Sequence, residues 1–314
     1  MAGAMSGTGR DEAALIAVDW GTSHARAYLV DGRGAVVGQR VAPIGVGVVR
    51  DGDFRAAFAG LLGDWAALAV PRVASGMIGS RQGWVEVPYV HCPADASALA
   101  AGIVHTPGGE LAVVPGVIVR DEAGVPDVIR GEETQAIGAI ADDEPDVLAV
   151  FPGTHSKWMH VSHGRIVDFE THMTGELYAV LLAHSLLGRL AQVAPAPSAP
   201  GPAFVRGVAR GLGRGGLGHL IFGARTLALT GELLPPEVPD WLSGLLIGRE
   251  VRSARTWANR RGLDAAHVRV IGADELVSRY RSALACEGIE AEAGPGDAAV
   301  RGIARIARLA KLVR

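Results

Sequence analysis

One local pattern occurs twice in this chain of 314 residues, and it limits the fold more than any other feature. An apolar strand runs into a Gly-Thr turn, a second strand, a Gly-containing turn, a third strand and then a helix. The aligned pairs lie at one common offset along the chain: Gly21-Thr22 with Gly153-Thr154, and Gly32-Arg33 with Gly164-Arg165. Two matched pairs inside one repeated order of elements predict a duplicated domain.

The length agrees with this prediction, since domains average roughly 150 residues. We expect a loose tail at 1–14, an N-terminal domain at 15–145 and a C-terminal domain at 146–314. Apolar runs predict strands, and apolar residues near helical spacing predict helices. The expected strands are 15–20, 25–30, 35–41, 113–119, 147–151, 158–161, 166–169 and 267–271. The expected helices are 53–69, 130–141, 175–191 and 297–312. The expected loops are 75–84, 193–202 and the Gly-rich stretch from 211 onward.

The composition excludes several classes of protein. The net charge is −3 and no Lys/Arg block occurs, which argues against a nucleic-acid partner. The longest apolar stretches, such as 111–119, fall short of the roughly 18 residues that a membrane span needs. Two cysteines, Cys92 and Cys286, are too few for a disulfide framework, so a cytoplasmic protein is expected.

The first Gly-Thr turn contains groups that can bind phosphate, and the carboxylate of Asp19 lies beside them. Successive amides in such a turn form an anion nest, and Gly21 lets a ligand approach the backbone. The hydroxyls of Thr22 and Ser23 can donate to phosphate oxygens. Asp19 would repel a phosphate unless Mg²⁺ lay between them. A plain Asx turn between two strands explains this segment as well.

The second turn carries a cation in place of the acid. It offers Gly153, Thr154, His155 and Ser156, and then Lys157, one of only two lysines in the sequence. A turn that holds a metal and a turn that holds phosphate oxygens would together clamp a nucleoside triphosphate. Here too, an ordinary hairpin remains an alternative.

Longer motifs make a more specific comparison. Together they resemble the 2-dehydro-3-deoxygalactonokinase family, in the actin-like ATPase and sugar kinase superfamily, over 15–312. The motifs that carry the resemblance are AVDWGTS (17–23), SGMIGSRQGW (75–84), RGEETQ (130–135), FPGTHSKW (151–158), MTGEL (173–177) and LSGLLIG (242–248). Phe151 stands where the family usually has Leu.

The resemblance implies an α/β fold of two actin-like (ribonuclease-H-like) domains, with duplicated β-hairpin phosphate turns and a nucleotide cleft between the domains. It implies ATP-dependent phosphorylation of 2-dehydro-3-deoxy-D-galactonate at its 6-hydroxyl, in galactonate breakdown, with Mg²⁺. Two alternatives are a kinase for another sugar acid and an ATPase on the same fold. A sugar-sensing regulator is disfavoured, because about 14 residues before the first strand cannot hold a helix-turn-helix. The oligomeric state stays open, with a homodimer as one option.

The resemblance also assigns roles to residues. In kinases a carboxylate accepts the proton of the attacking hydroxyl, and Glu132 is nearest that position, with Glu133 as the alternative. The expected catalytic residues are Glu132, Asp19 and Lys157, with Asp19 also the metal ligand. The expected substrate-binding residues are Ser80, Arg81, Gln82, Trp84, Glu133, Thr174 and Glu176. Backbone amides of 76–80 are the alternative to Arg81 for the substrate carboxylate. The expected nucleotide-binding residues are Gly21, Thr22, Ser23, Gly153, Thr154, His155, Ser156, Gly244, Gly248, Gly272 and Ala273. Helix capping, strand–helix packing and a solvated loop are the structural alternatives for these groups.

Overall fold

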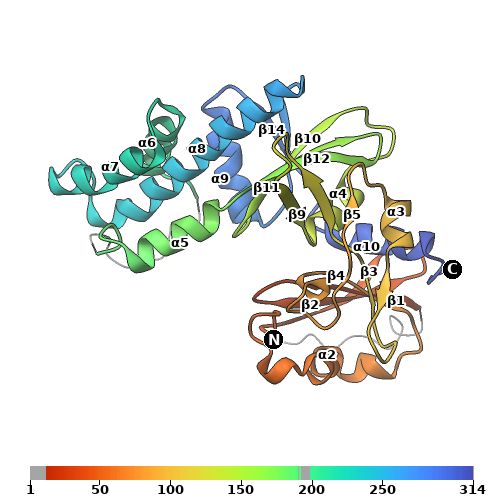
Figure 1. Cartoon of the computed structure of the whole chain (residues 1–314). Helices are drawn as coiled ribbons and strands as arrows, with labels where there is room; N and C mark the ends of the chain where they lie inside the picture. The colour runs from red at the N-terminus through yellow and green to blue at the C-terminus, as the bar shows by residue number, and fades with distance from the viewer. Residues whose placement is uncertain (1–11, 190, 192–198, 314) are drawn as a thin grey trace. The chain divides into compact units, whose positions relative to one another are not determined.

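A computed structural model describes residues 12–189, 191 and 199–313 of the chain (Figure 1). The described residues group into two units by their contacts. Unit 1 holds those of 1–145, 161–168 and 297–314, and unit 2 holds those of 146–160 and 169–296. Most of the expected tail 1–14 and of the expected linker 193–202 lies outside the described residues.

Unit 1 is built on a six-stranded sheet in the order β3-β2-β1-β4-β7-β6. Its strands are β1 (Ala13–Trp20), β2 (Ala25–Asp31), β3 (Val36–Ala42), β4 (Arg72–Gly76), β6 (Val104–His105) and β7 (Ala112–Val113). The central strand β1 is antiparallel to β2 and parallel to β4. Its run Leu15–Val18 is buried without alternation, as expected for a strand that is covered on both faces.

Helix α2 (Phe54–Leu62) supplies apolar side chains to the core of this sheet. The rings of Phe54 and Phe58 lie 6.2 and 6.1 Å from the ring of Trp20. The helix ends earlier than the predicted 53–69, because Gly63 takes a φ of 51° that ordinary residues avoid. A 3₁₀ turn, η2 (Gly63–Ala67), continues the chain.

Helix α10 (Ala298–Leu309) packs on α4 (Glu132–Ala139) in unit 1. Two glycines allow the helix backbones to touch. A Cβ on Gly138 would lie 2.0 Å from the Ala298 carbonyl oxygen, and a Cβ on Gly302 would lie 1.8 Å from that of Thr134. The sequence analysis assigned this C-terminal segment to the second domain, whereas the contact groups it with unit 1.

The remainder of unit 1 is a small sheet, β5-β8-β9, with short helices. These elements are β5 (Val90–His91), β8 (Val117–Arg120), β9 (Pro126–Ile129), α3 (Ala96–Ala101), η1 (Arg50–Gly52) and η3 (Met77–Gly79). The single strand expected at 113–119 is wrong. Pro115 and Gly116 break it, so that β7 and β8 join different sheets. Residues 161–168, expected in the C-terminal domain, also group with unit 1, where Ile166 bridges to Ala94.

Unit 2 repeats the sheet order of unit 1. The order β12-β11-β10-β13-β14 corresponds to β3-β2-β1-β4-β7, and β13 is parallel to β10 as β4 is to β1. The strands are β10 (Val147–Phe151), β11 (Ser156–Ser162), β12 (Arg165–His172), β13 (His267–Val270) and β14 (Glu290–Ala293), and the parts of β11 and β12 within 161–168 group with unit 1 by their contacts. The predicted duplication of the strand–turn–strand pattern is confirmed.

The helices of unit 2 gather beside this sheet (Figure 1). They are α5 (Thr174–His184), α6 (Pro202–Leu212), α7 (Leu217–Leu229), η4 (Pro235–Glu237), α8 (Val238–Arg260) and α9 (Asp274–Ala285). The loop predicted from Gly211 onward is wrong at its start. Gly211 lies in α6, and a Cβ there would be 2.2 Å from the Leu245 carbonyl oxygen of α8. Helix α5 stops at His184, short of the predicted Ala191. Within the described ranges, no helix is both long enough and apolar enough to cross a membrane.

Candidate functional site

Three of the sequence motifs meet at the carboxyl ends of β1 and β4. The parallel register places Asp19 beside Ser75 and Trp20 beside Gly76. The Ser75 hydroxyl lies 2.9 Å from that of Thr134 in α4. The structure therefore brings the Asp19 turn, the end of β4 and the start of α4 to one place in unit 1.

Asp19 and Glu132 are the carboxylates that these elements bring together. Burial raises the pKa of Asp19, the Arg26 guanidinium at 3.4 Å opposes the rise, and the negative charge of Glu132 adds to it. The Asp19 side chain still keeps 21% of its surface exposed. A carboxylate whose pKa is raised by a neighbouring negative charge favours a cation or a proton beside it.

Glu133 differs sharply from its neighbour, because it is fully buried. Its Oε2 accepts a hydrogen bond of 2.7 Å from the Gly131 amide, so it is bonded to the backbone just before α4. Its Oε1 has no hydrogen-bond partner among the described residues. Burial, followed by the charge of Glu132, raises the pKa of Glu133 to about 8.

The first turn is held by backbone hydrogen bonds. The carbonyl oxygens of Gly21, Thr22 and Ser23 accept from the amides of Val46, Gly47 and Gly45, each at 3.0 Å. The side chains of Thr22 and Ser23 are exposed, and among the described residues their amides donate to no protein acceptor. These free amides can bind an anion.

The loop that follows β4 divides its side chains between core and solvent. Ser80 is buried and its hydroxyl has no partner in the described chain, whereas Arg81 and Gln82 are exposed. The Trp84 ring lies 5.8 Å from that of Phe58, so part of it belongs to the apolar core.

Arg130 is a residue to which the sequence analysis gave no role. Its guanidinium lies 4.1 Å from the centre of the Tyr89 ring and donates to the Val87 carbonyl. It thereby ties the chain after the Ser80–Trp84 loop to the start of α4. Its place directly before the Gly-Glu-Glu motif was the available sequence signal.

The second turn is held by side chains. His155 hydrogen-bonds to Glu176 at the start of α5, and the Glu176 amide donates to the Thr154 carbonyl at 2.9 Å. A Cβ on Gly175 would lie 2.4 Å from the Gly153 carbonyl oxygen, so only glycine fits there. Thr174 and Glu176, expected at the substrate, have their polar contacts within unit 2.

Lys157 is 8% exposed and folds back onto the same turn. Its Nζ donates to the His155 carbonyl oxygen at 2.7 Å. Ser156 points instead to the buried Glu250 of α8, with Oγ and Oε2 2.7 Å apart. Sequence reasoning missed Glu250, although it is a carboxylate that follows closely after the glycine-rich LSGLLIG motif.

A pocket beside this turn opens in unit 2. Its lining residues are Gly153, Thr174, Gly175, Tyr178, Ser243, Leu246, Ile247, Glu275, Leu276, Arg279 and Tyr280. Arg279 is buried and pairs with Asp240 at 2.7 Å, which fixes part of the wall. Apolar walls with a few polar groups are typical of a small-molecule site.

The glycines expected around a nucleoside separate into two groups. Gly244 and Gly248 pack α8 on α6, since Cβ atoms there would lie 2.1 and 2.6 Å from carbonyl oxygens of α6. Neither of them lines the pocket. Gly272 and Ala273 are exposed between β13 and α9, and a Cβ on Gly272 would be 3.5 Å from Pro152.

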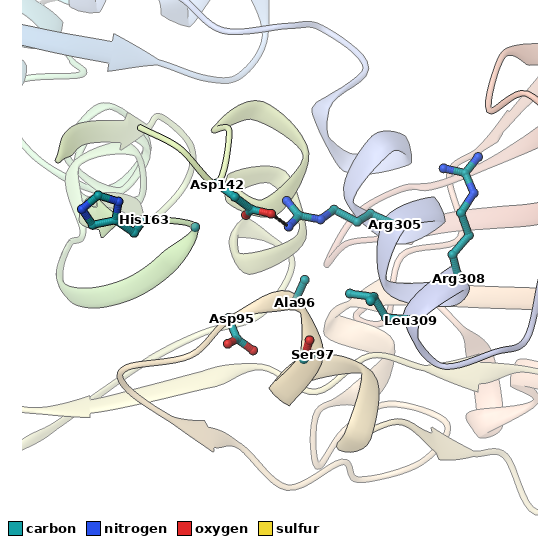
Figure 2. A pocket seen from close by; sticks show the side chains of 9 residues that line it. Asp95, Ala96, Ser97, Asp142, His163, Arg305, Arg308 and Leu309 are labelled. Carbon is teal, nitrogen blue, oxygen red and sulfur yellow. Dashed lines mark hydrogen bonds and ion pairs between the residues drawn. The ribbon is translucent and has the colours of Figure 1, made fainter. Parts of the chain in front are cut away.

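Another hollow in unit 1 lies between α3, α10 and the β11–β12 turn (Figure 2). Asp142 pairs there with Arg305, and Asp95 caps α3 by accepting from the Ala98 amide at 2.8 Å. None of the site residues expected from the sequence lines this hollow.

Comparisons with known proteins identify the family. The sequence profile of the 2-keto-3-deoxy-galactonokinase family matches residues 19–306. The 2-dehydro-3-deoxygalactonokinase of Escherichia coli (strain K12) is 36% identical over 296 residues, which cover 94% of this chain and 98% of the relative. A solved structure from Sinorhizobium meliloti, provisionally named a 2-dehydro-3-deoxygalactonokinase, has a TM-score of 0.85 at 33% identity, with 94% and 98% covered.

A more distant solved structure shares the fold alone. It is the activator of the 2-hydroxyisocaproyl-CoA dehydratase from Clostridium difficile with bound ADPNP. Its TM-score is 0.52 at 12% identity, with 95% of each chain covered. The expected two-domain α/β fold of the actin-like type is thereby confirmed.

Proposed function

Because the chain belongs to the 2-keto-3-deoxy-galactonokinase family, we propose that it transfers the γ-phosphoryl group of ATP to 2-dehydro-3-deoxy-D-galactonate. The acceptor is the 6-hydroxyl of the sugar acid, a step in galactonate breakdown. The observation that carries the proposal is the meeting of Asp19 and Glu132 where β1, β4 and α4 end or begin. The two free thiols, Cys92 and Cys286, fit a cytoplasmic enzyme.

Glu132 is the proposed general base. It lies at the start of α4 and keeps partial access to solvent, whereas Glu133 is sealed and bonded to the backbone. A carboxylate that accepts the proton of the attacking hydroxyl is the usual base in kinases. Substrate is held by the loop after β4, where the exposed guanidinium of Arg81 can bind a carboxylate and Gln82 can bind hydroxyls.

Asp19 is the proposed ligand for Mg²⁺. Its desolvated carboxylate is repelled by Glu132, and a bound cation would relieve that repulsion. Among the described residues no group of three or more His, Cys, Asp and Glu forms a metal cage. This fits Mg²⁺, which is usually held by one or two carboxylates together with substrate phosphates. When bound, Mg²⁺ neutralises charge on the transferring phosphoryl group.

Unit 2 is the proposed nucleotide unit. Lys157 and the turn Gly153–Ser156 bind phosphates, and the neighbouring pocket with Tyr178, Leu246 and Ile247 receives the nucleoside. In unit 1 the turn Gly21–Ser23 offers its free amides to phosphate oxygens. Gly272 and Ala273 contribute to the nucleoside side of the site.

A coupled ADP-release assay across a panel of 2-keto-3-deoxy sugar acids tests the proposal, with the phosphorylated position read by NMR. We expect the galacto acid to give the highest kcat/KM and phosphate on its 6-hydroxyl. A higher kcat/KM for another sugar acid would make the enzyme a kinase for that acid. ADP release that does not depend on any acid would make it an ATPase.

A further inference from the structure

Glu250 gathers hydrogen bonds from three different elements of unit 2. Its Oε1 accepts from the Trp158 indole at 2.8 Å, and its Oε2 accepts from Ser156 at 2.7 Å and from Tyr280 at 2.8 Å. The Thr174 hydroxyl donates to the same Oε2. The glutamate is only 3% exposed, so these contacts take place in the protein interior.

The donors come from elements that shape the proposed nucleotide site. Ser156 ends the second turn, and Thr174 directly precedes the glycine that packs against that turn. Thr174 and Tyr280 also line the neighbouring pocket. Burial and the charge of Glu250 raise the pKa of Tyr280 well above its ordinary value, so its hydroxyl remains a donor.

Four donors that point at one side chain are best matched by a carboxylate, which only accepts hydrogen bonds. All four donors are neutral, so no ion pair offsets the cost of burying the charge. A glutamine would keep only part of the network. If its oxygen faced the indole N–H, its amide nitrogen would have to donate to the hydroxyls, and two N–H groups cannot serve three hydroxyls. Such a costly buried charge calls for a role besides stability.

We propose that Glu250 is the positioning residue of the nucleotide phosphate turn. It fixes Ser156 on one side of the turn and Thr174 on the other, so that the amides of Gly153–His155 are preorganised before ATP binds. The inference rests on the proposed function, because it takes the bound anion to be the phosphate chain of a nucleotide.

The test compares Glu250→Gln with the wild-type enzyme and with Glu290→Gln, an exposed control on β14. Binding of ADP and of the non-hydrolysable analogue ADPNP is measured by calorimetry without sugar acid, and steady-state kinetics are measured with each substrate varied. We expect Glu250→Gln to weaken nucleotide binding at least tenfold and to raise the KM for ATP similarly. The KM for the sugar acid should change less than twofold, and Glu290→Gln should match the wild type.

Variants that each remove one hydrogen-bond donor distinguish an effect on nucleotide affinity from an effect on stability. Ser156→Ala and Thr174→Val should each weaken nucleotide binding several-fold, and they carry the test if Glu250→Gln does not fold. Trp158→Phe removes the donor to Oε1 and keeps the Ser156 and Thr174 bonds to Oε2, so it should lower the melting temperature with less than a twofold effect on nucleotide binding. Wild-type nucleotide affinity in Glu250→Gln, or in both Ser156→Ala and Thr174→Val, would overturn the inference. Failure of the wild type to phosphorylate any sugar acid would instead overturn the proposed function.

Discussion

The two copies of the strand–turn–strand hairpin hold their turns by different means. The first turn is fastened by three backbone hydrogen bonds from the chain at 45–47. The second has one backbone hydrogen bond, from the Glu176 amide to the Thr154 carbonyl, and is fastened further by the side chains of Glu176, Glu250 and Lys157. Both turns need a glycine at a backbone contact, Gly45 at the first and Gly175 at the second, and the second turn depends in addition on particular side chains and their charge.

The two copies also differ in which charged residue they carry at aligned positions. When the Gly-Thr pairs are aligned, Asp19 corresponds to Phe151, which is buried in an apolar core, and Lys157 corresponds to Ala25. The acid therefore belongs to the first copy and the cation to the second. The duplicated scaffold leaves each copy free to take one half of the charge pattern that a metal–phosphate ligand needs.

Glu132→Gln tests whether the general base lies in unit 1, apart from the proposed nucleotide turn of unit 2. The amide keeps the shape and loses the basicity, so kcat should fall by ~10²–10⁴-fold. Nucleotide affinity should stay within twofold of wild type, as measured by calorimetry. Equal loss of nucleotide affinity would contradict the role as base, and inactivity of Glu133→Gln alone would move the base to that residue.

Asp19→Asn removes the carboxylate that the second copy lacks. We expect kcat to fall about 10²–10³-fold, since a preorganised charge at the phosphates is lost. The apparent affinity for Mg²⁺, followed by a Mn²⁺ competition titration, should fall as well. Glu122→Gln, at an exposed position, is the control. Near-normal activity of Asp19→Asn at low Mg²⁺ would remove Asp19 from the metal site.

Lys157→Arg keeps the positive charge of the second turn and replaces the compact ammonium group with a broader guanidinium. The broad guanidinium does not fit a buried point-charge site, so the KM for ATP should rise about tenfold. Lys311→Arg alters the other lysine of the chain and should leave the KM for ATP unchanged. Identical kinetics for the two variants would show that the ammonium group is not needed.

Gly45→Ala tests the backbone fastening of the first turn. Its Cβ would lie 2.2 Å from the backbone of Thr22 and Ser23, so we expect the free energy of unfolding to fall by about 1–3 kcal/mol. Gly47→Ala places its Cβ 3.4 Å from the Thr22 carbonyl oxygen and serves as the matched control in urea unfolding. Equal free energies of unfolding for the two variants would show that the chain at 45–47 moves to accommodate the added methyl group.

Glu133→Gln should alter how stability depends on pH. The carboxyl of Glu133 has its pKa raised to about 8, so the folded state holds this proton more tightly than the unfolded state does. Its contribution to stability is present below about pH 4.5 and is lost as pH rises to about 8, with a slope of at most about 1.4 kcal/mol per pH unit. Urea unfolding between pH 5 and 8 should show a shallower loss for Glu133→Gln. Parallel curves would contradict the raised pKa.

The local sequence predicted the hairpins and the order of elements well, because strand periodicity and turn glycines are local signals. The repeated Gly-Thr turns and the Asp19 strand were found in this way. Element ends were less certain: the predicted helix 53–69 stops at Gly63, and nothing in the helical spacing of Trp65 and Leu68 shows the positive φ there.

Contacts between residues far apart in the sequence could not be predicted from local patterns. Glu250 meets Ser156 across 94 positions of sequence, and no periodicity marks that pairing. The sequence does not show whether Gly244 and Gly248 serve helix packing or ligand binding. Their contacts with the α6 backbone decide for packing. Placing these residues requires the tertiary fold, whereas the chemistry of the turn residues follows from their types.

The contact of α10 with α4 has a consequence for biosynthesis. The helix that starts with Glu132 rests on a helix that the ribosome makes only after all of 146–296. At ~5–20 residues per second, the earlier helix waits on the order of 10 s for its partner. Unit 1 therefore cannot complete its packing until 297–314 have been made, and α4 lacks its contact with α10 for all of that time.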